Sequence, residues 1–129
     1  MIGTVNLEAA FAQLTDHWSP RVVGRVNDQY VKVAKVLGEL AWHQHDDEDE
    51  LFQVVRGTLR IEVKDQPDVL LQAGEFCVIP RGTLHNPVAE QECWIMLVET
   101  VTTRHTGDVQ TARTRSVEEQ LLGQPGGKI

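Results

Sequence analysis

Short apolar segments separated by turn residues are the feature that most restricts how this chain can fold. From Val22 onward, stretches rich in Val, Leu and Ile are interrupted by Gly, Pro and Asn-Asp pairs. The pattern predicts strands over residues 22–26, 29–37, 40–45, 51–55, 58–64, 69–72, 75–79 and 92–101. Because the segments do not alternate with helical patterns, a parallel α/β sheet is disfavoured. The chain is expected to be all-β, a sandwich or a barrel.

A short amphipathic helix is predicted before the first strand. Residues 7–14 place their apolar side chains on one helical face, and Asn6 precedes them as a potential N-cap. The apolar residues of this face are Leu7, Ala10, Phe11 and Leu14. Ser19-Pro20 is expected to interrupt the helical segment, which we assign to residues 1–20.

A second short helix is predicted near the C-terminus. Ser116 and Glu119 have the spacing of a capping box, and Gly123 is a helix stop. Residues 124–129 are expected to form a frayed tail. The chain of 129 residues is predicted to be a single domain with three parts, residues 1–20, 22–101 and 102–129.

Composition narrows the class of protein and its compartment. The hydrophobic fraction of 41% and charged fraction of 24% are ordinary for a globular domain, and no apolar run approaches the roughly 20 residues of a membrane span. The first basic residue is Arg21, so a signal peptide is not expected and a cytoplasmic location is predicted. Cys77 and Cys93 lie in apolar stretches and are expected to be buried, reduced, structural thiols.

Most of the net charge of −7 comes from five consecutive acids, Asp46 to Glu50. An acidic chain without a Lys/Arg cluster repels phosphate groups, which disfavours nucleic acid and anionic membranes as partners. The simplest interpretation of residues 46–49 is a solvated turn, with one acid at the mouth of a site as the alternative.

Three histidines and one glutamate are candidates for a metal site. His43 and His45 alternate along an extended segment, so their imidazoles share a face with Cα atoms about 7 Å apart. Glu50 begins a predicted strand, and His85 follows a turn at residues 80–82. Two imidazoles with a carboxylate and a third imidazole suit one transition-metal ion.

The spacing of these residues resembles the two motifs of the cupin family. The first motif is matched by Gly38-x4-His43-x-His45-x4-Glu50-x6-Gly57, with one residue fewer than usual after the first Gly. The second is matched by Gly74-x5-Pro80-x-Gly82-x2-His85. Ala89 stands where the family usually has Asn, which removes any substrate contact that this Asn would make.

The resemblance covers residues 22–101 and implies a single cupin β-barrel, a double-stranded β-helix or jelly roll, with short terminal helices. It implies one divalent metal ion per chain, held by His43, His45, Glu50 and His85. These ligands suit Fe, Mn, Ni, Zn, Cu and Co alike. Small cupins commonly form homodimers, and the strand at 22–26 offers an edge that such pairing would cover.

Four ligands leave positions open for a small organic substrate, so a metal-dependent enzyme is favoured. The reaction stays open between a dioxygenase and a Lewis-acid isomerase, epimerase or lyase. A sugar phosphate is disfavoured because no basic cluster lies near either motif. The alternatives are a module that binds metal or a small ligand without turnover and, less favoured, a structural metal.

Several side chains outside the four candidate ligands carry polar or aromatic groups that a site could use. Phe52 is expected to share the face of Glu50, where it lines the pocket or packs in the core. His17 and His105 are expected to be exposed or locally hydrogen-bonded. Strand bulges leave the faces unassigned for Tyr30, Lys32, Lys35, Arg56 and Arg60.

Overall fold

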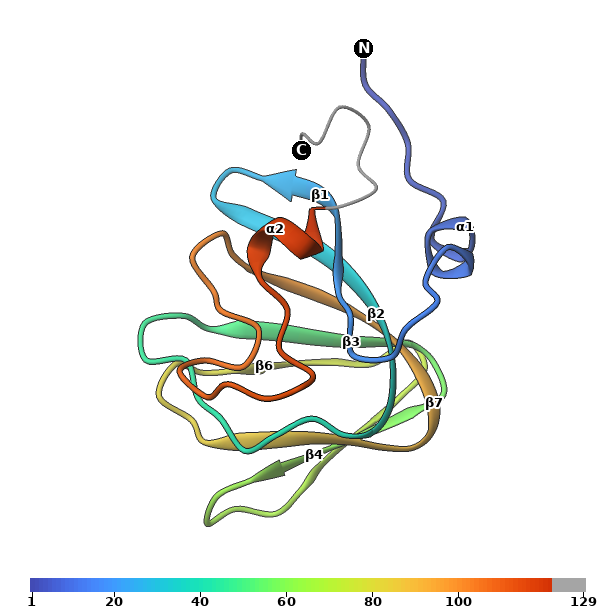
Figure 1. The fold of residues 1–129 in the computed structure, drawn as a ribbon. Coiled ribbons are helices and arrows are strands. Elements are labelled where there is room, and N and C mark those ends of the chain that lie inside the picture. The colour runs from blue at the N-terminus through green and yellow to red at the C-terminus, as the bar shows by residue number, and fades with distance from the viewer. Residues whose placement is uncertain (122–129) are drawn as a thin grey trace.

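The computed structural model describes residues 1–121, and it is dominated by antiparallel strands (Figure 1). The all-β prediction is therefore confirmed. The strands are β1 (Arg21–Val26), β2 (Gln29–Glu39), β3 (Glu50–Arg56), β4 (Thr58–Val63), β5 (Val69–Gln72), β6 (Phe76–Ile79) and β7 (His85–Thr100). The helices are α1 (Leu7–Ala12) and α2 (Val117–Gln120).

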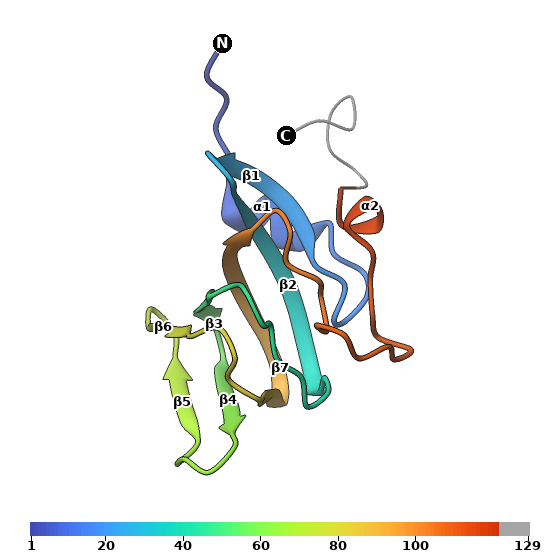
Figure 2. The same ribbon diagram turned by 90° about the vertical axis from the view of Figure 1, so that its left-hand side faces the viewer.

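The long strand β7 organises the sheet. It pairs with β2 along most of its length, and its other edge is shared by β4 and β3. The sheet order is β1-β2-β7-β3-β6, with β4 bridging β7 and β5. Figure 2 shows β2 and β7 side by side, with the β4–β5 hairpin extending below them. This pairing forms one continuous antiparallel sheet with β1 and β6 at the ends of its order, and its inward side chains form a core, as expected for a cupin barrel or jelly roll.

Two strand predictions were wrong in their extent. Residues 40–45 do not form a strand, because only Leu40 and His43 keep backbone hydrogen bonds to β7 before the chain turns into the acidic run. In contrast, β7 begins at His85 and not near residue 92. Pro87 and the polar residues 90–92 resemble a loop in sequence, but β4 pairs with residues 85–88 and β2 with residues 88–89, while residues 90–92 lie at an irregularity in the pairing.

The barrel core consists of apolar side chains that face inward from the strands. Its largest members include Trp18, Leu59, Ile61 and Ile95, all at most 2% exposed. The Trp18 indole donates a hydrogen bond of 2.7 Å to the Leu37 carbonyl, which satisfies its one polar atom inside the core.

The helix at residues 7–14 is confirmed in its essentials. It spans Leu7–Ala12, and the Asn6 side chain accepts a hydrogen bond of 2.9 Å from the Ala9 amide. Its apolar face packs on the outside of the sheet, where the Phe11 ring stacks on Trp94 at a centroid distance of 4.8 Å. The helix thus covers the face of β2 and β7 opposite to the barrel interior.

The prediction of a terminal helix holds within residues 1–121, and the prediction on the thiols holds in part. The Ser116 side chain and Glu119 form the predicted capping box of α2. Both cysteines are free thiols, but only Cys93 is buried, which raises its pKa to about 11, whereas Cys77 is partly buried. Gly123 and the tail at 124–129 lie outside the described residues. Neither helix is long and apolar enough to cross a membrane.

Candidate metal centre

A two-residue bridge joins the predicted ligand motifs. His43 and His85 exchange backbone hydrogen bonds of 2.9 Å in both directions, which fixes the two segments against each other. The Gly82 amide donates a further bond of 2.7 Å to the His45 carbonyl. Gly82 has a φ of 77°, a left-handed conformation that favours glycine, so the turn before His85 depends on it.

Glu50 is placed by strand pairing on both sides of β3. Its cross-strand partners are Ile79 in β6 and Glu99 in β7. Its neighbour Asp49, predicted to lie in a solvated turn, accepts a hydrogen bond of 2.9 Å from the Arg81 amide. The end of the acidic run therefore has a structural role. Asp49 holds the turn before His85 through Arg81, and the side chain of Glu50 is buried in the barrel.

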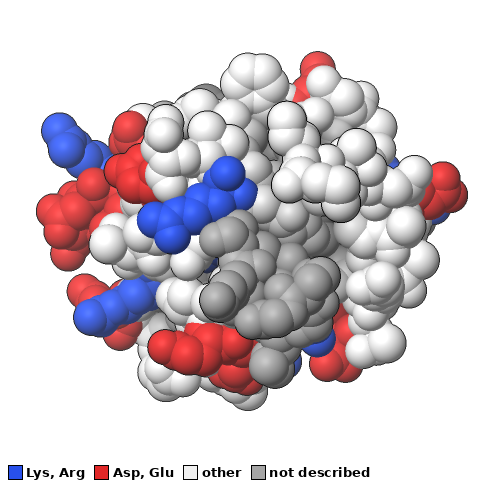
Figure 3. Space-filling model, turned by 90° about the horizontal axis from the view of Figure 1, so that it is seen from above, with Lys and Arg blue, Asp and Glu red and all other residues white. Residues whose placement is uncertain are grey.

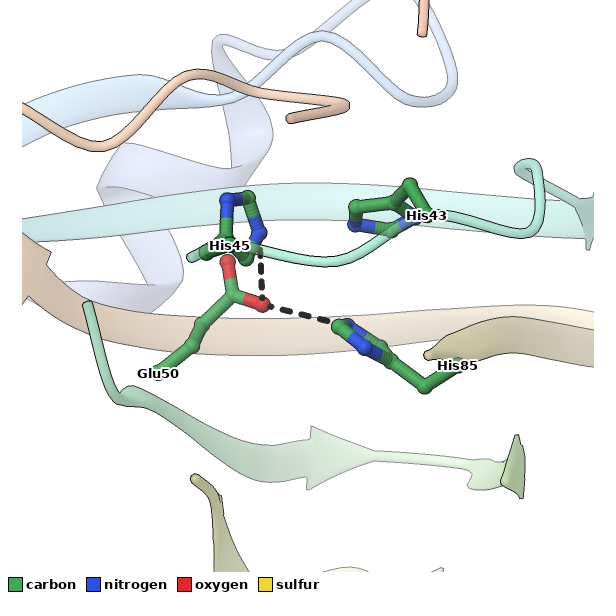
Figure 4. Close-up of side chains that lie close together, drawn as sticks. All are labelled: His43, His45, Glu50 and His85. Atoms are coloured by element: carbon green, nitrogen blue, oxygen red, sulfur yellow. Dashed lines mark ion pairs between the residues drawn. The ribbon is translucent and has the colours of Figure 1, made fainter. Parts of the chain in front are cut away.

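The four predicted ligands converge in the barrel interior (Figure 4). One potential ligand atom from each of His43, His45, Glu50 and His85 lies within 4.8 Å of the other three. Glu50 Oε1 is 3.5 Å from both His45 Nε2 and His85 Nε2. Atoms that share an ion at about 2.1 Å are themselves about 3 to 3.5 Å apart, so this spacing fits a common metal.

The hydrogen bonds of the imidazoles leave the inner nitrogens available. His43 Nδ1 donates to the Ala41 carbonyl and His85 Nδ1 donates to the Thr83 carbonyl, each at 2.8 Å. Among the described residues, no hydrogen-bond partner is found for the buried atoms His85 Nε2, Glu50 Oε1 and both His45 ring nitrogens. Buried polar atoms are normally paired, so these orphaned atoms fit a missing cation.

Burial and mutual contact shift the protonation of the cluster. Burial, helped by the neighbouring His85, lowers the pKa of His43 to about 4. Burial opposes the charge of Glu50, but contacts with Glu99, His45 and His85 hold its pKa well below the usual value. Neutral imidazole and ionised carboxylate are the forms that bind metal.

Comparison with known proteins places this site in a family. The family model for the cupin domain matches residues 30–98, a segment that includes all four ligands. The chain belongs to the cupin family. YdbB of Bacillus subtilis is 39% identical over 80 residues, which cover 62% of this cupin and 71% of YdbB. A nitrosourea synthase of Streptomyces achromogenes is 37% identical over 71 residues, 54% of this chain but 15% of the synthase.

Solved structures share the barrel of this cupin. A cupin-2 domain protein from Shewanella frigidimarina has 48% sequence identity and a TM-score of 0.72, over 74% of this chain and 93% of that one. Hydroquinone 1,2-dioxygenase from Sphingomonas sp. TTNP3 has a TM-score of 0.70 over 77% of this chain and 32% of its own. At 21% identity, that likeness shows the fold alone.

A buried ion pair beside the cluster was not predicted from sequence. Lys32 Nζ lies 2.7 Å from Glu99 Oε1, and both side chains are at most 3% exposed. Burial and the adjacent Glu50 carboxylate raise the pKa of Glu99 well above its usual value. The sequence does contain a signal for the burial of Glu99. Side chains alternate between the two faces of a strand, so Glu99 lies on the same face of β7 as the buried residues Ile95 and Leu97.

The other unassigned cations lie away from the cluster. Lys35 and Arg56 place their charges over the Trp94 ring at 5.2 and 3.9 Å. Arg60 forms ion pairs with Glu62, Asp68 and Glu90 on the outer surface. The buried Tyr30 ring lies under Lys32 at 5.8 Å.

The two remaining histidines have different surroundings. His17 is partly exposed and contacts Glu92 at 2.8 Å, so the prediction of a locally bonded surface residue is confirmed. His105 is also locally bonded, because its Nδ1 accepts a bond of 3.0 Å from the Arg115 amide. Its position beside the cluster was not expected from sequence.

A small cavity adjoins the candidate metal centre. It has a volume of about 20 Å³ and is lined by His43, Glu50, Phe52 and His105 among apolar side chains. Phe52 is 3% exposed, and its ring centroid lies 6.1 Å from that of His85. Phe52 therefore belongs to the core and also lines the cavity, so the two alternatives left open by the sequence coincide.

An acidic cleft lies on the outer side of His45. It has a volume of about 250 Å³ and is lined by His45, Asp46, Asp47 and Glu48 together with residues between 102 and 108, which follow β7. Three acids of the run thus line the same cleft as His45, one of the candidate ligands. On the face of the molecule shown in Figure 3, acidic and basic side chains are interspersed.

Proposed function

We propose that this cupin is an enzyme that uses one divalent transition-metal ion to act on a small organic substrate. The observation that carries the proposal is the cluster of His43, His45, Glu50 and His85, whose potential ligand atoms lie within 4.8 Å of one another. Buried atoms of three of these residues, His45, Glu50 and His85, have no hydrogen-bond partner among residues 1–121. A purely structural histidine cluster would be expected to satisfy these atoms with protein partners.

The protein residues hold and orient this site. The backbone bonds between His43 and His85 keep two imidazoles in place, and their Nδ1 contacts fix which nitrogen faces inward. Glu50 supplies one negative charge from a rigid strand. A bound metal ion would polarise a substrate oxygen or support oxygen chemistry, because four protein ligands leave coordination positions open.

The reaction class has two candidates. One is a dioxygenase, the activity named for the structural neighbour hydroquinone 1,2-dioxygenase. The other is Lewis-acid isomerase, epimerase or lyase chemistry. Activity with redox-inert Zn²⁺ under argon would favour the second, whereas substrate-dependent O₂ uptake by the Fe²⁺-loaded protein would favour the first.

Metal content tests the proposal directly. Untagged protein from a defined-metal culture is compared with His43→Ala and His85→Ala by mass spectrometry. We expect about one metal equivalent in the parent and little in either variant, because each substitution removes one of four ligands. Absence of metal in the parent, even after reconstitution, would refute the proposal.

A binding module without turnover is the second candidate. The observation that favours it is the small cavity beside the ligands, whose volume of about 20 Å³ admits little more than one water-sized group. Catalytic conversion of any substrate that is lost in His85→Ala would exclude this alternative.

We also propose that the protein forms a homodimer through β1. Within residues 1–121, this strand pairs only with β2 and lies at an edge of the sheet. Light scattering coupled to size-exclusion chromatography would show a mass of two chains, and a monomer at micromolar concentration would contradict the assignment.

A further inference from the structure

The C-terminal segment, defined here as residues 101–116, lies beyond the residues that match the cupin domain and packs against the site. Figure 1 shows it as an orange-to-red loop that leaves β7 and reaches α2 next to β1. A Cβ atom on Gly107 would collide with the carbonyl oxygen of Gln44, the residue between His43 and His45. This segment therefore sits directly on the backbone of the first ligand motif.

The segment is held by polar contacts at several points. The Thr102 hydroxyl donates to Glu48 at 3.2 Å, and the Arg113 guanidinium lies 6.0 Å from the Trp18 ring centroid. Thr103 and Thr106 are fully buried. These contacts fix the position of the residues between them, including His105.

His105 enters the cavity beside the ligands from this segment. It lines the same volume as His43, Glu50 and Phe52. Its Nδ1 accepts the Arg115 amide hydrogen at 3.0 Å, so the neutral ring carries its own hydrogen on Nε2. Nε2 has no hydrogen-bond partner among residues 1–121. Burial lowers the pKa of this ring to about 4, which agrees with a neutral imidazole at pH 7.

We infer that His105 contacts the substrate, donating its Nε2 hydrogen to an acceptor atom of a small ligand bound beside His43 and Glu50. This inference rests on the proposed metal-dependent function.

The cavity lining also limits the chemical class of the ligand. No Lys or Arg lines this cavity within the described residues, and its other walls are apolar, including Trp18 and Ile95. A free phosphate or sulfonate would have no cation there apart from the metal. Because the cavity of about 20 Å³ admits only a small terminal group, the lining favours the carbonyl, enolate or phenolate oxygen of a molecule whose remainder extends beyond this cavity, with the metal offsetting the charge of that oxygen.

The test uses azide as the probe, a small anion with a terminal hydrogen-bond acceptor. Co²⁺-loaded protein is titrated with azide, and the visible absorbance gives Kd for the parent and four variants. His105→Phe removes the donor, whereas His105→Gln keeps an amide donor and an acceptor for the Arg115 amide. Gly107→Ala displaces the segment, and His17→Phe is the matched control on the surface.

We expect His105→Phe and Gly107→Ala to raise the azide Kd at least about tenfold, because a donor to a charged ligand is lost. His105→Gln should recover most of the affinity and His17→Phe should match the parent. Cobalt content should be equal in all five proteins, which separates a ligand contact from a role in metal retention.

Three results would overturn the inference. Unchanged azide affinity in His105→Phe would mean that the ring makes no ligand contact. Loss of cobalt in His105→Phe would assign the residue to the metal or the fold. If the parent holds no metal, the proposed function itself fails. The ¹⁵N spectrum of the His105 imidazole in the apoprotein then tests the inference separately, because a ring that carries its hydrogen on Nδ1 at pH 7 cannot donate from Nε2.

Discussion

Two buried polar clusters lie side by side in this barrel, and they differ in how their atoms are satisfied. Lys32 and Glu99 form a close ion pair of 2.7 Å. The neighbouring cluster around Glu50 has contacts of 3.5 Å and several buried atoms without a hydrogen-bond partner in residues 1–121. In the first cluster the two charges meet directly and one oxygen, Glu99 Oε2, lacks a hydrogen-bond partner among residues 1–121, whereas the second has four such atoms and could hold a cation.

The comparison separates two uses of buried charge. A pair such as Lys32–Glu99 stays folded because each charge compensates the other, and removal of one partner leaves an uncompensated charge. In the cluster around Glu50, buried polar atoms without hydrogen-bond partners destabilise the folded apoprotein. The free energy of binding a metal ion would offset this loss. Substitutions in the two clusters should therefore affect different measurements.

The largest expected effect is on metal content. Glu50→Gln should reduce bound metal from about one equivalent to below about 0.1, because the one carboxylate of the candidate cluster in residues 1–121 is lost. The apoprotein should unfold at the same urea concentration as the parent or at a higher one, since a buried charge is removed. A large loss of stability in apo Glu50→Gln would show that the cluster is structural.

The next effect is on stability. Lys32→Met should lower the free energy of unfolding of the apoprotein by about 3 kcal/mol, because Glu99 loses its countercharge in the barrel interior. The double variant Lys32→Met/Glu99→Leu should recover most of this loss. Urea denaturation measures both. A single variant as stable as the parent would mean that the pair contributes nothing.

The four clustered residues were predictable from sequence because the spacing within each motif is local and resembles the cupin motifs. Two histidines two residues apart and a turn with Gly82 bring them together without knowledge of strand register. The face of Lys32 was left unassigned because a bulge inverts parity, and β2 does contain an irregularity at Val36/Gly38, while Glu99 was not singled out although its parity with Ile95 and Leu97 was available. A one-residue shift moves a side chain from one face to the other.

His105 was missed for a different reason. Its position depends on how residues 101–116 pack against Gln44 and Trp18, and these contacts join segments that are far apart in the chain. A neighbouring Arg104 and Thr106 suggest an exposed loop when they are read as sequence alone. Only the folded barrel brings this histidine next to His43.

The third prediction concerns pH. The folded pKa of His105 is about 4, below the usual 6.5, so below pH 6.5 the unfolded chain takes up a proton that the folded chain does not. Its contribution is therefore fully present above pH 6.5 and is lost as the pH falls to 4. The full shift corresponds to about 3 kcal/mol, and partial exposure reduces this to about 2 kcal/mol.

The measurement is the difference between the apoprotein and His105→Gln, by urea denaturation across pH 4 to 7. The carboxylates contribute equally to both proteins, so the difference isolates His105. The parent should lose about 2 kcal/mol more than the variant over this range. Parallel curves would show that the ring is protonated freely in the folded state and is not enclosed.

The smallest expected effect tests the boundary between the two clusters. Glu99 is the cross-strand partner of Glu50, and burial together with the Glu50 carboxylate raises the pKa of Glu99. Glu99→Gln keeps a polar side chain of the same shape and should change metal affinity by less than about threefold, whereas Glu99→Leu should weaken it by about tenfold. Competition with a chromophoric chelator measures both. If Glu99→Gln and Glu99→Leu were equally impaired, the Glu99 charge would act on the metal, and the ion pair and the ligand cluster would form one electrostatic unit.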